Sequence, residues 1–285
     1  MKKKINNLIT VFLVLILLAG LSLLLYPTFS DWWNSYHQTK AIASYVADVA
    51  NLSNEDYEKI WKAATEYNAS LSERNSDYTL TEEQKKQYEQ LLNVSGDGIM
   101  GYIEIPSINC SLPIYHGTQE SVLQIAVGHI EWSSLPVGGA SSHCVVSGHR
   151  GLPSAKLFTN LDELSKGDTF MLRVLDEVLT YEVDQILIVE PQETGALQIE
   201  EGKDYCTLVT CTPYGINTHR LLVRGRRITT PDKLKHIRVT SDAIKIEPIL
   251  TAPIMALPLL LVLLFWLLFA PSKRSSAKDK THKTQ

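Results

Sequence analysis

The sequence predicts a mainly β fold: a closed β-barrel with short helices, preceded by an α-helical region and flanked by two transmembrane helices. Three observations lead to this prediction. Two long apolar runs without charged residues lie near the two ends of the chain. Apolar residues at helical spacing follow the first run, and short segments rich in β-branched residues, separated by glycine and proline turns, follow Gly98. Many short strands with few helices between them are typical of a β-barrel or sandwich.

The first apolar run extends from Leu8 to Tyr26 and follows three lysines at positions 2–4. A helix needs about 20 apolar residues to cross the hydrocarbon core of a membrane, and this run is long enough. A cleaved signal peptide is the alternative, but residues 26–30, Tyr-Pro-Thr-Phe-Ser, lack the small residues of a cleavage site. We therefore expect residues 1–30 to form a cytoplasmic tip and an uncleaved membrane anchor.

The second apolar run extends from Ile249 to Ala270 and is followed by a basic tail, residues 271–285. A buried core helix is the alternative, but the place of the run in the sequence and the basic tail favour a second transmembrane helix. Basic residues at the outer ends of both runs place both termini in the cytoplasm by the positive-inside rule. The expected location is the cell membrane, with two passes and the intervening domain outside the cell.

The region from residue 31 to 96 is predicted to be helical. Apolar residues repeat at helical spacing from Ile42 to Val49. Ser53 or Asn54 is a suitable cap for a second helix, and residues 81–84 have the composition of a capping box that opens a third. Aromatic residues at helical spacing are more often packing faces than cofactor sites, so we assign them to packing.

The barrel is predicted for residues 97–230, followed by a linker at 231–248 and the second membrane segment at 249–270. The alternation of side chains and the β-branched residues predict strands at residues 100–106, 145–146, 170–174, 179–189 and 205–210.

Charge and cysteine content exclude several classes of function. The chain has 285 residues and a formal net charge of −4, without a basic stripe in its middle, so nucleic acid is not an expected partner. The four cysteines show no close CxxC pair and no metal-ligand spacing with histidine, and no acidic cluster has the spacing of a calcium loop. We expect no metal, no cofactor and at least one free thiol.

Cys211 is the candidate nucleophile. A strand-like run, residues 207–210, ends at this cysteine and turn residues 212–215 follow, so the thiol is expected at the rim of a sheet. Most free cysteines are small buried hydrophobic residues. That interpretation is favoured for the other three, which are Cys110, Cys144 and Cys206.

A cysteine nucleophile needs a neighbouring cation or base, because a nearby cation lowers the thiol pKa from about 8.5. His149 lies among glycines after a predicted strand, so its ring can project into a cleft. Arg220 follows Cys211 across a turn, and a hairpin would bring it beside the cysteine, where its charge can stabilise an oxyanion. Each residue alone is a weak signal, since a single histidine is more often structural than catalytic.

Residues 207–211, Thr-Leu-Val-Thr-Cys, resemble the TLxTC signature of the sortase family. Arg220 matches the essential arginine of that family, and His149 in the Gly-His-Arg segment matches its histidine. The resemblance extends from about residue 100 to residue 227. The two apolar runs and the helical region resemble the pilin-polymerising class C branch in particular, and so do four stretches at residues 101–106, 112–118, 147–157 and 211–224.

The resemblance implies a sortase-type β-barrel and a two-step acyl transfer. Cys211 would attack the Thr–Gly bond of an LPxTG-like sorting signal and form a thioester, which an amine then resolves. His149 would act as general acid and base, and Arg220 would stabilise the oxyanion or position the signal. Three residues would contribute to substrate binding: Thr210, Thr207 and Leu208. The implied partners are pilin subunits with LPxTG-like C-terminal signals, an acceptor pilin lysine or a cell-wall precursor, and the membrane.

One segment departs from the class C pattern. Most class C sortases carry a lid with an Asp-Pro-aromatic motif before the barrel, whereas residues 76–80 of this chain are Ser-Asp-Tyr-Thr-Leu. Asp77 and Tyr78 are the lid candidates, but the proline is absent. We therefore expect either no standard lid or a weakened one.

Three alternatives remain open. A sortase that attaches single proteins to the cell wall would use the same chemistry, although the second membrane run and residues 115–117 and 213–215 favour pilus assembly. In a cysteine peptidase, water would resolve the thioester. A non-catalytic membrane scaffold for surface assembly is the third, and the intact set of Cys211, His149 and Arg220 is evidence against it. Four other histidines are expected to be structural or surface residues: His116, His129, His143 and His219.

Overall fold

The computed structural model describes residues 2–72 and 79–231. Contacts divide the chain into two compact units, residues 1–25 with 245–285 and residues 26–244. In the first unit, the described residues all belong to helix α1 (Lys2–Ala50). The C-terminal half of this helix belongs to the second unit. By length and composition, α1 contains a stretch apolar enough to cross a membrane, and none of that stretch is buried. The second predicted membrane run, most of the linker and the basic tail lie outside the described residues.

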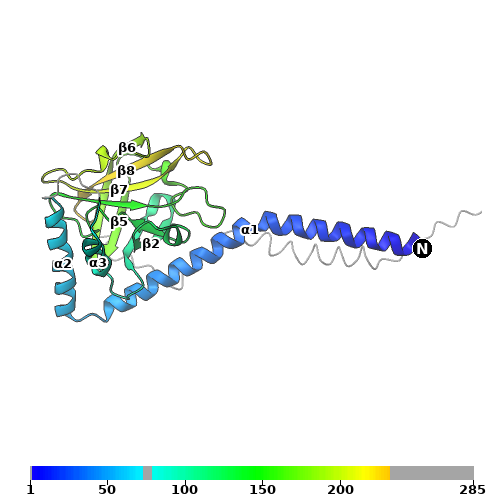
Figure 1. Ribbon diagram of the computed structural model, residues 1–285, viewed down its shortest axis with the longest axis horizontal. Coiled ribbons are helices and arrows are strands. Elements are labelled where there is room, and N and C mark those ends of the chain that lie inside the picture. The colour runs from blue at the N-terminus through cyan, green and yellow to red at the C-terminus, as the bar shows by residue number, and fades with distance from the viewer. Residues whose placement is uncertain (1, 73–78, 232–285) are drawn as a thin grey trace, which may run out of the picture. The chain divides into compact units, whose positions relative to one another are not determined.

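Eight strands close into a barrel in the order β1-β2-β3-β4-β7-β8-β6-β5 (Figure 1). The pairs β2·β3 and β4·β7 are parallel, and the other pairs are antiparallel. This arrangement confirms the predicted mainly β barrel. The strands are β1 (Ile99–Ile105), β2 (Cys110–His116), β3 (Val127–His129), β4 (Ser142–Ser147), β5 (Thr169–Val174), β6 (Glu177–Val189), β7 (Asp204–Thr212) and β8 (His219–Ile228).

The predicted helix starts are confirmed. The hydroxyl of Ser53 accepts the N–H of Asp56 at 3.1 Å, just before α2 (Asn54–Ser72). At α3 (Glu82–Gln90), the Thr81 hydroxyl accepts the N–H of Gln84 and the Gln84 side chain accepts the N–H of Thr81, which is a complete capping box. The remaining helices of the described residues are short: α4 (Glu120–Leu123), η1 (Pro106–Ile108), η2 (Leu161–Glu163) and η3 (Gly195–Leu197).

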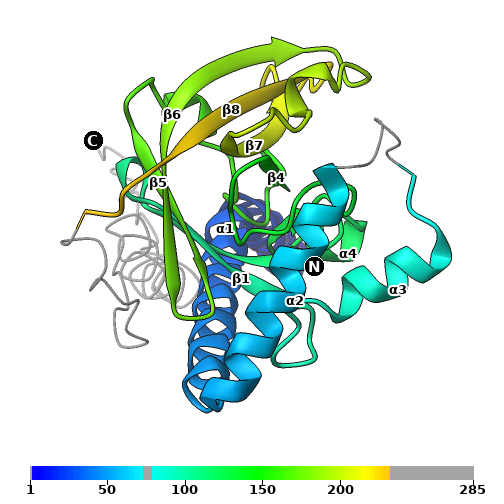
Figure 2. The same cartoon turned by 90° about the vertical axis from the view of Figure 1, so that its left-hand side faces the viewer.

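Strand β1 is buried along its whole length because both of its faces are covered. Ile103 and Ile105 point into the barrel core, whereas Met100 and Tyr102 pack in a second cluster with residues of α1, α2 and α3. Figure 2 shows α2 and α3 lying beside the barrel on the β1 side. The helical region is thus a packed layer over one wall of the barrel, in agreement with the assignment of its aromatic residues to packing.

Two strands, β2 and β3, were not predicted. β2 contains Pro113, which cannot donate a ladder hydrogen bond and argues against a central strand. The structure tolerates it because β3 pairs with β2 only from Ile114 onwards, so β2 has a single neighbour at the proline. β3 has only three residues and is too short for alternation to be recognised.

Candidate active site

Cys211 and Arg220 face each other across the β7–β8 hairpin. The two residues are register partners on antiparallel strands, so their side chains lie on the same face of the sheet. Cys211 is a free thiol and is half-buried, one residue before the end of β7. The guanidinium of Arg220 donates from Nη1 to the carbonyl oxygens of His219 at 3.2 Å and Asn217 at 3.4 Å. The hairpin predicted from the sequence is therefore confirmed.

His149 is held beside the same end of β7 by the parallel pairing of β4 and β7. Ser147, the last residue of β4, is in register with Val209, and the N–H of Gly148 donates to the Val209 carbonyl at 3.0 Å. The Thr210 hydroxyl then donates to the Gly148 carbonyl at 2.7 Å. His149 follows directly, and so the three predicted catalytic residues lie at one end of three neighbouring strands, β4, β7 and β8.

Gly148 is required at this turn for steric reasons. A Cβ atom at this position would lie 2.8 Å from the Phe158 ring and 2.9 Å from the Val127 side chain. The Phe158 N–H in turn donates to the His149 carbonyl at 3.1 Å, so the turn is closed from both sides. The close packing fixes the backbone of His149 relative to β7.

Glu120 is the acidic neighbour of His149. Its Oε2 lies 3.8 Å from His149 Nε2, which has no hydrogen-bond partner among the described residues. The Gln124 side chain donates to the other carboxylate oxygen. Glu120 was not predicted from the sequence, because an exposed acid at the start of a short helix carries no local signal of a distant histidine.

Arg150 connects the His149 turn to the residue that follows Cys211. Its Nη1 donates to the Thr212 hydroxyl at 3.3 Å, and its Nη2 forms an ion pair with Asp162. The guanidinium also lies 5.8 Å from the ring centre of Tyr214. Arg150 is next to His149 in the sequence. The two residues that it joins, Asp162 and Thr212, are 12 and 62 positions away, so the sequence alone does not indicate these contacts.

Thr207 and Leu208 were expected to contact the substrate. Neither side chain reaches the surface beside Cys211, so the structure does not support these contacts. Leu208 is fully buried in the barrel core. Thr207 is also buried, and its hydroxyl lies 2.7 Å from His143 Nε2. Thr210 is nearly fully buried too, and its hydroxyl is used to position the turn before His149.

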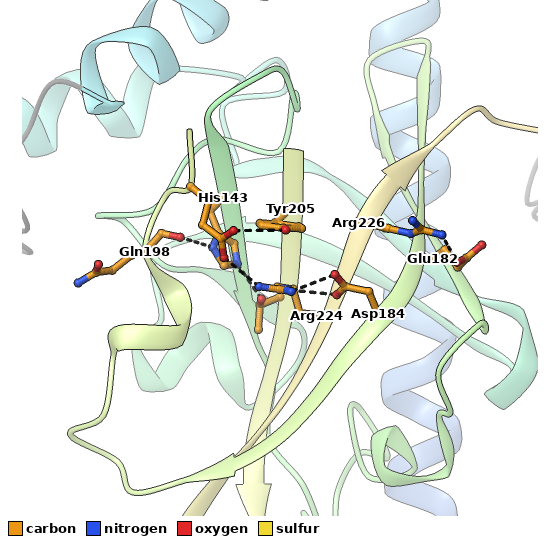
Figure 3. A network of polar contacts seen from close by, with 9 residues as sticks. His143, Glu182, Asp184, Gln198, Tyr205, Arg224 and Arg226 are labelled. Carbon is orange, nitrogen blue, oxygen red and sulfur yellow. Dashed lines mark hydrogen bonds and ion pairs between the residues drawn. The ribbon is translucent and has the colours of Figure 1, made fainter. Parts of the chain in front are cut away.

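His143 belongs to a polar network at the other end of β7 (Figure 3). Its Nδ1 lies 2.8 Å from the Gln198 carbonyl, and burial lowers its pKa, which favours the neutral ring. Arg224 stacks over the Tyr205 ring at 4.1 Å and forms ion pairs with Asp184 at 2.9 Å and Glu200 at 3.2 Å. The network ties the connection between β6 and β7 to the barrel wall.

The other histidines also make structural contacts. His129 is buried, with Nδ1 3.0 Å from the Tyr88 hydroxyl and Nε2 2.8 Å from the Ser134 carbonyl. Both ring nitrogens of His116 lie within 3.0 Å of backbone carbonyl oxygens. His219 lies at the start of β8 and is exposed.

The lid candidates Asp77 and Tyr78 lie outside the described residues. Within residues 2–72 and 79–231, no three His, Cys, Asp or Glu side chains gather closely enough to hold a metal ion.

Thiol labelling is expected to distinguish Cys211 from the other cysteines. Cys144 and Cys206 have almost no exposed surface, and burial raises the pKa of the Cys110 thiol to about 12. At pH 8 roughly one Cys110 thiol in ten thousand is then ionised, and only the thiolate reacts. Iodoacetamide should therefore modify Cys211 first, as measured by mass spectrometry of the native protein. Modification of Cys110 at an equal rate would contradict the assignment.

Replacing Thr210 with valine is expected to lower the free energy of unfolding by about 1–3 kcal/mol, because the buried Gly148 carbonyl loses its donor. Turnover should fall as well, because the turn before His149 loosens. Thr65→Val is the control: its hydroxyl bonds the Lys62 carbonyl on the exposed surface of α2. Thermal unfolding by circular dichroism should show a clear drop for Thr210→Val only, and equal melting temperatures would refute the role of the Thr210 bond.

Known proteins are similar to this chain in fold and in sequence. The Sortase domain family matches residues 103–228. The solved structure of sortase C1 from Streptococcus agalactiae is 50% identical, and the match covers 67% of this chain and 100% of that chain with a TM-score of 0.66. Sortase C from Streptococcus pneumoniae is 44% identical, with coverage of 67% and 97% and a TM-score of 0.61.

The match to curated relatives covers a smaller share of their sequences than the match to these solved structures does. Sortase D of Bacillus subtilis is 34% identical over 132 residues, which are 45% of this chain. The chain spans slightly less than two thirds of that relative and of sortase A from Streptococcus agalactiae, 64% in each case. The match to sortase C1, at 50% identity, extends over the whole of that solved chain, however. This chain therefore belongs to the sortase family, whose members are cysteine transpeptidases, and class C sortases are among its structural relatives.

Proposed function

We propose that this protein is a pilus-assembling sortase: it cleaves an LPxTG-like sorting signal through a thioester on Cys211 and joins the signal to a lysine amine of a pilin. The observation that carries the proposal is the convergence of a half-exposed thiol, a histidine and an arginine at one end of β4, β7 and β8. The similarity to sortase C of Streptococcus pneumoniae, whose structure was reported with its pilin substrate specificity, supports the choice of a pilin.

In the first step, the Cys211 sulfur attacks the carbonyl carbon of the Thr–Gly bond. Arg220, on the same sheet face, stabilises the negative charge that develops on the oxygen. The C–N bond breaks, His149 gives a proton to the leaving amine, and a thioester remains on the enzyme.

In the second step, a lysine amine attacks the thioester carbonyl and loses a proton to His149. The C–S bond breaks, the Cys211 thiolate leaves, and an amide bond has formed. One amide is exchanged for another, so the reaction needs no external energy source. Replacement of the amine by water would give hydrolysis, which is the peptidase alternative.

We place the enzyme in the cell membrane with two passes, both termini in the cytoplasm and the barrel outside. The apolar stretch of α1 supports the first pass. Substrates that carry membrane segments are concentrated in the same two-dimensional layer, which raises their effective concentration at the site.

The type of product tests this proposal. Cells that lack the gene should be complemented with the wild-type chain, and boiled cell-wall extracts should be separated on a denaturing gel and blotted for surface proteins. A ladder of very large species is expected. A shift of single proteins from medium to wall would instead identify an anchoring sortase. Purified enzyme that only hydrolyses a sorting peptide, even with lysine amines present, would identify a peptidase.

A further inference from the structure

An aromatic face lies on α1 directly after its apolar run. It consists of Phe29, Trp32, Trp33 and Tyr36, whose exposures range from 41% for Trp32 to 59% for Phe29. Phe29 stacks on Trp33 and Trp32 stacks on Tyr36, with ring centres 6.4 and 6.5 Å apart. The Phe29 and Trp32 rings lie 5.8 Å apart and join the two pairs, so the cluster is contiguous. An exposed apolar patch of this kind marks an interaction surface.

The opposite face of the same helix segment is polar and is bonded to the barrel domain. With 3.6 residues per turn, the four aromatic residues lie within an arc of roughly 100°, and the polar residues lie roughly opposite its centre. All three polar side chains bond backbone groups of loops. The pairs are Asp31 Oδ1 with Lys156 N at 2.8 Å, Asn34 Nδ2 with Ser154 O at 2.8 Å and Gln38 Nε2 with Ile125 O at 2.6 Å.

This arrangement is the reverse of an amphipathic helix on a domain surrounded by water, which turns its apolar face to the protein. Water around this segment would solvate four large aromatic rings, whereas Asp31, Asn34 and Gln38, which prefer water, are turned toward the barrel domain. The reversal is favourable when the medium outside the helix is partly apolar.

The apolar run before the aromatic face identifies that medium. A helix from Leu8 to Tyr26 is about 28 Å long, close to the hydrocarbon thickness of about 30 Å. The segment from Phe29 to Tyr36 follows this run after two residues, so the chain connection keeps it next to the headgroup zone. Tryptophan and tyrosine are enriched at that depth. The single charged residue between Tyr26 and Gln38 is Asp31, which is bonded to the barrel domain.

We propose that Phe29, Trp32, Trp33 and Tyr36 bind the boundary between lipid headgroups and acyl chains and form an interfacial anchor in addition to the membrane span. The partner of this aromatic face is the membrane surface, not a second protein. The loop at residues 154–156, which follows His149, is bonded to the same helix turns. If the proposed function holds, the anchor also fixes the height of the His149 turn above the membrane, where sorting signals of membrane-borne substrates emerge.

Depth-dependent fluorescence quenching tests this proposal without relying on activity. The full chain would be reconstituted into vesicles of phosphatidylcholine and phosphatidylglycerol that carry bromine atoms at a shallow or a deep position of the acyl chain. One variant, Trp61→Phe/Trp132→Phe/Trp266→Phe, keeps Trp32 and Trp33. The matched control, Trp32→Phe/Trp33→Phe/Trp266→Phe, keeps Trp61 and Trp132. Trp266 lies outside the described residues and is removed from both.

The variant that keeps Trp32 and Trp33 should be quenched, more strongly by the shallow bromines, and the control should not be quenched. If neither lipid quenches Trp32 and Trp33, the proposal is overturned. Quenching by aqueous acrylamide would then show that the two residues face water, and its absence that protein covers them. Should the first variant fail to fold, Trp266→Phe can be compared with Trp32→Phe/Trp33→Phe/Trp266→Phe. Loss of the shallow quenching is then expected, and its persistence would also overturn the proposal.

Discussion

Cys211→Ala is expected to abolish cleavage of a sorting peptide and the ladder of covalent polymers, with a loss in kcat of roughly 10⁴-fold or more, as for other removed nucleophiles. The reason is chemical: without the sulfur no thioester forms, and Arg220 and His149 have no intermediate on which to act. The barrel should be unaffected, because Cys211 is half-buried at the end of β7 and outside the barrel core cluster.

Cys110→Ala is the matched control for this prediction. Cys110 is also a free, partly buried cysteine of the barrel, but burial raises its pKa to about 12 and its sulfur lies 3.9 Å from the Leu157 carbonyl. This variant should retain both cleavage and the ladder. Both activities would be measured, by peptide cleavage in vitro and by blots of cell-wall extracts. A ladder that persists with Cys211→Ala would refute the catalytic assignment and favour a non-catalytic scaffold.

Local signals in the sequence predicted those parts of the fold that depend on neighbouring residues. The capping box at Thr81 and the β7–β8 hairpin involve contacts within a few residues or across one turn, and both are confirmed. The pairing of β4 with β7 joins segments about 60 residues apart. Nothing in the sequence of either strand indicates which strand it pairs with. The position of His149 relative to Cys211 depends on that pairing. The neighbouring glycines and the match to a family pattern therefore predicted a role for His149, but not its place beside Cys211.

The error at Leu208 was avoidable on physical grounds. Successive side chains of a strand alternate between faces, so a residue three positions before Cys211 lies on the opposite face. That face is the barrel interior, as the burial of Leu208 and Cys206 shows. Thr207 shares the face of Cys211 but is covered by His143, which comes from a strand distant in sequence. Alternation could have excluded Leu208, whereas no local pattern could have excluded Thr207.

A second large effect is expected at the buried ion pair between Arg173 on β5 and Glu104 on β1. Arg173 Nε lies 2.7 Å from Glu104 Oε2, and the two side chains are only 5% and 10% exposed. Arg173 is the register partner of Tyr102, which packs in the cluster between barrel and helices, so the pair lies on that covered face. Removing one partner leaves the other charge buried, which costs about 3–5 kcal/mol.

Arg173→Met should therefore lower the melting temperature of the protein by roughly 6–20 °C, at about 2–4 °C per kcal/mol for a domain of this size. Arg173→Met/Glu104→Leu should recover much of this loss, because both charges of the pair are then removed. Lys62→Met is the control, since its ion pair with Glu66 is 3.7 Å long and exposed, and such pairs contribute little. Circular dichroism melts of the full chain in detergent would measure all three. Equal destabilisation by the single and the double variant would show that lost packing, and not an unpaired charge, determines the cost at this wall of the barrel.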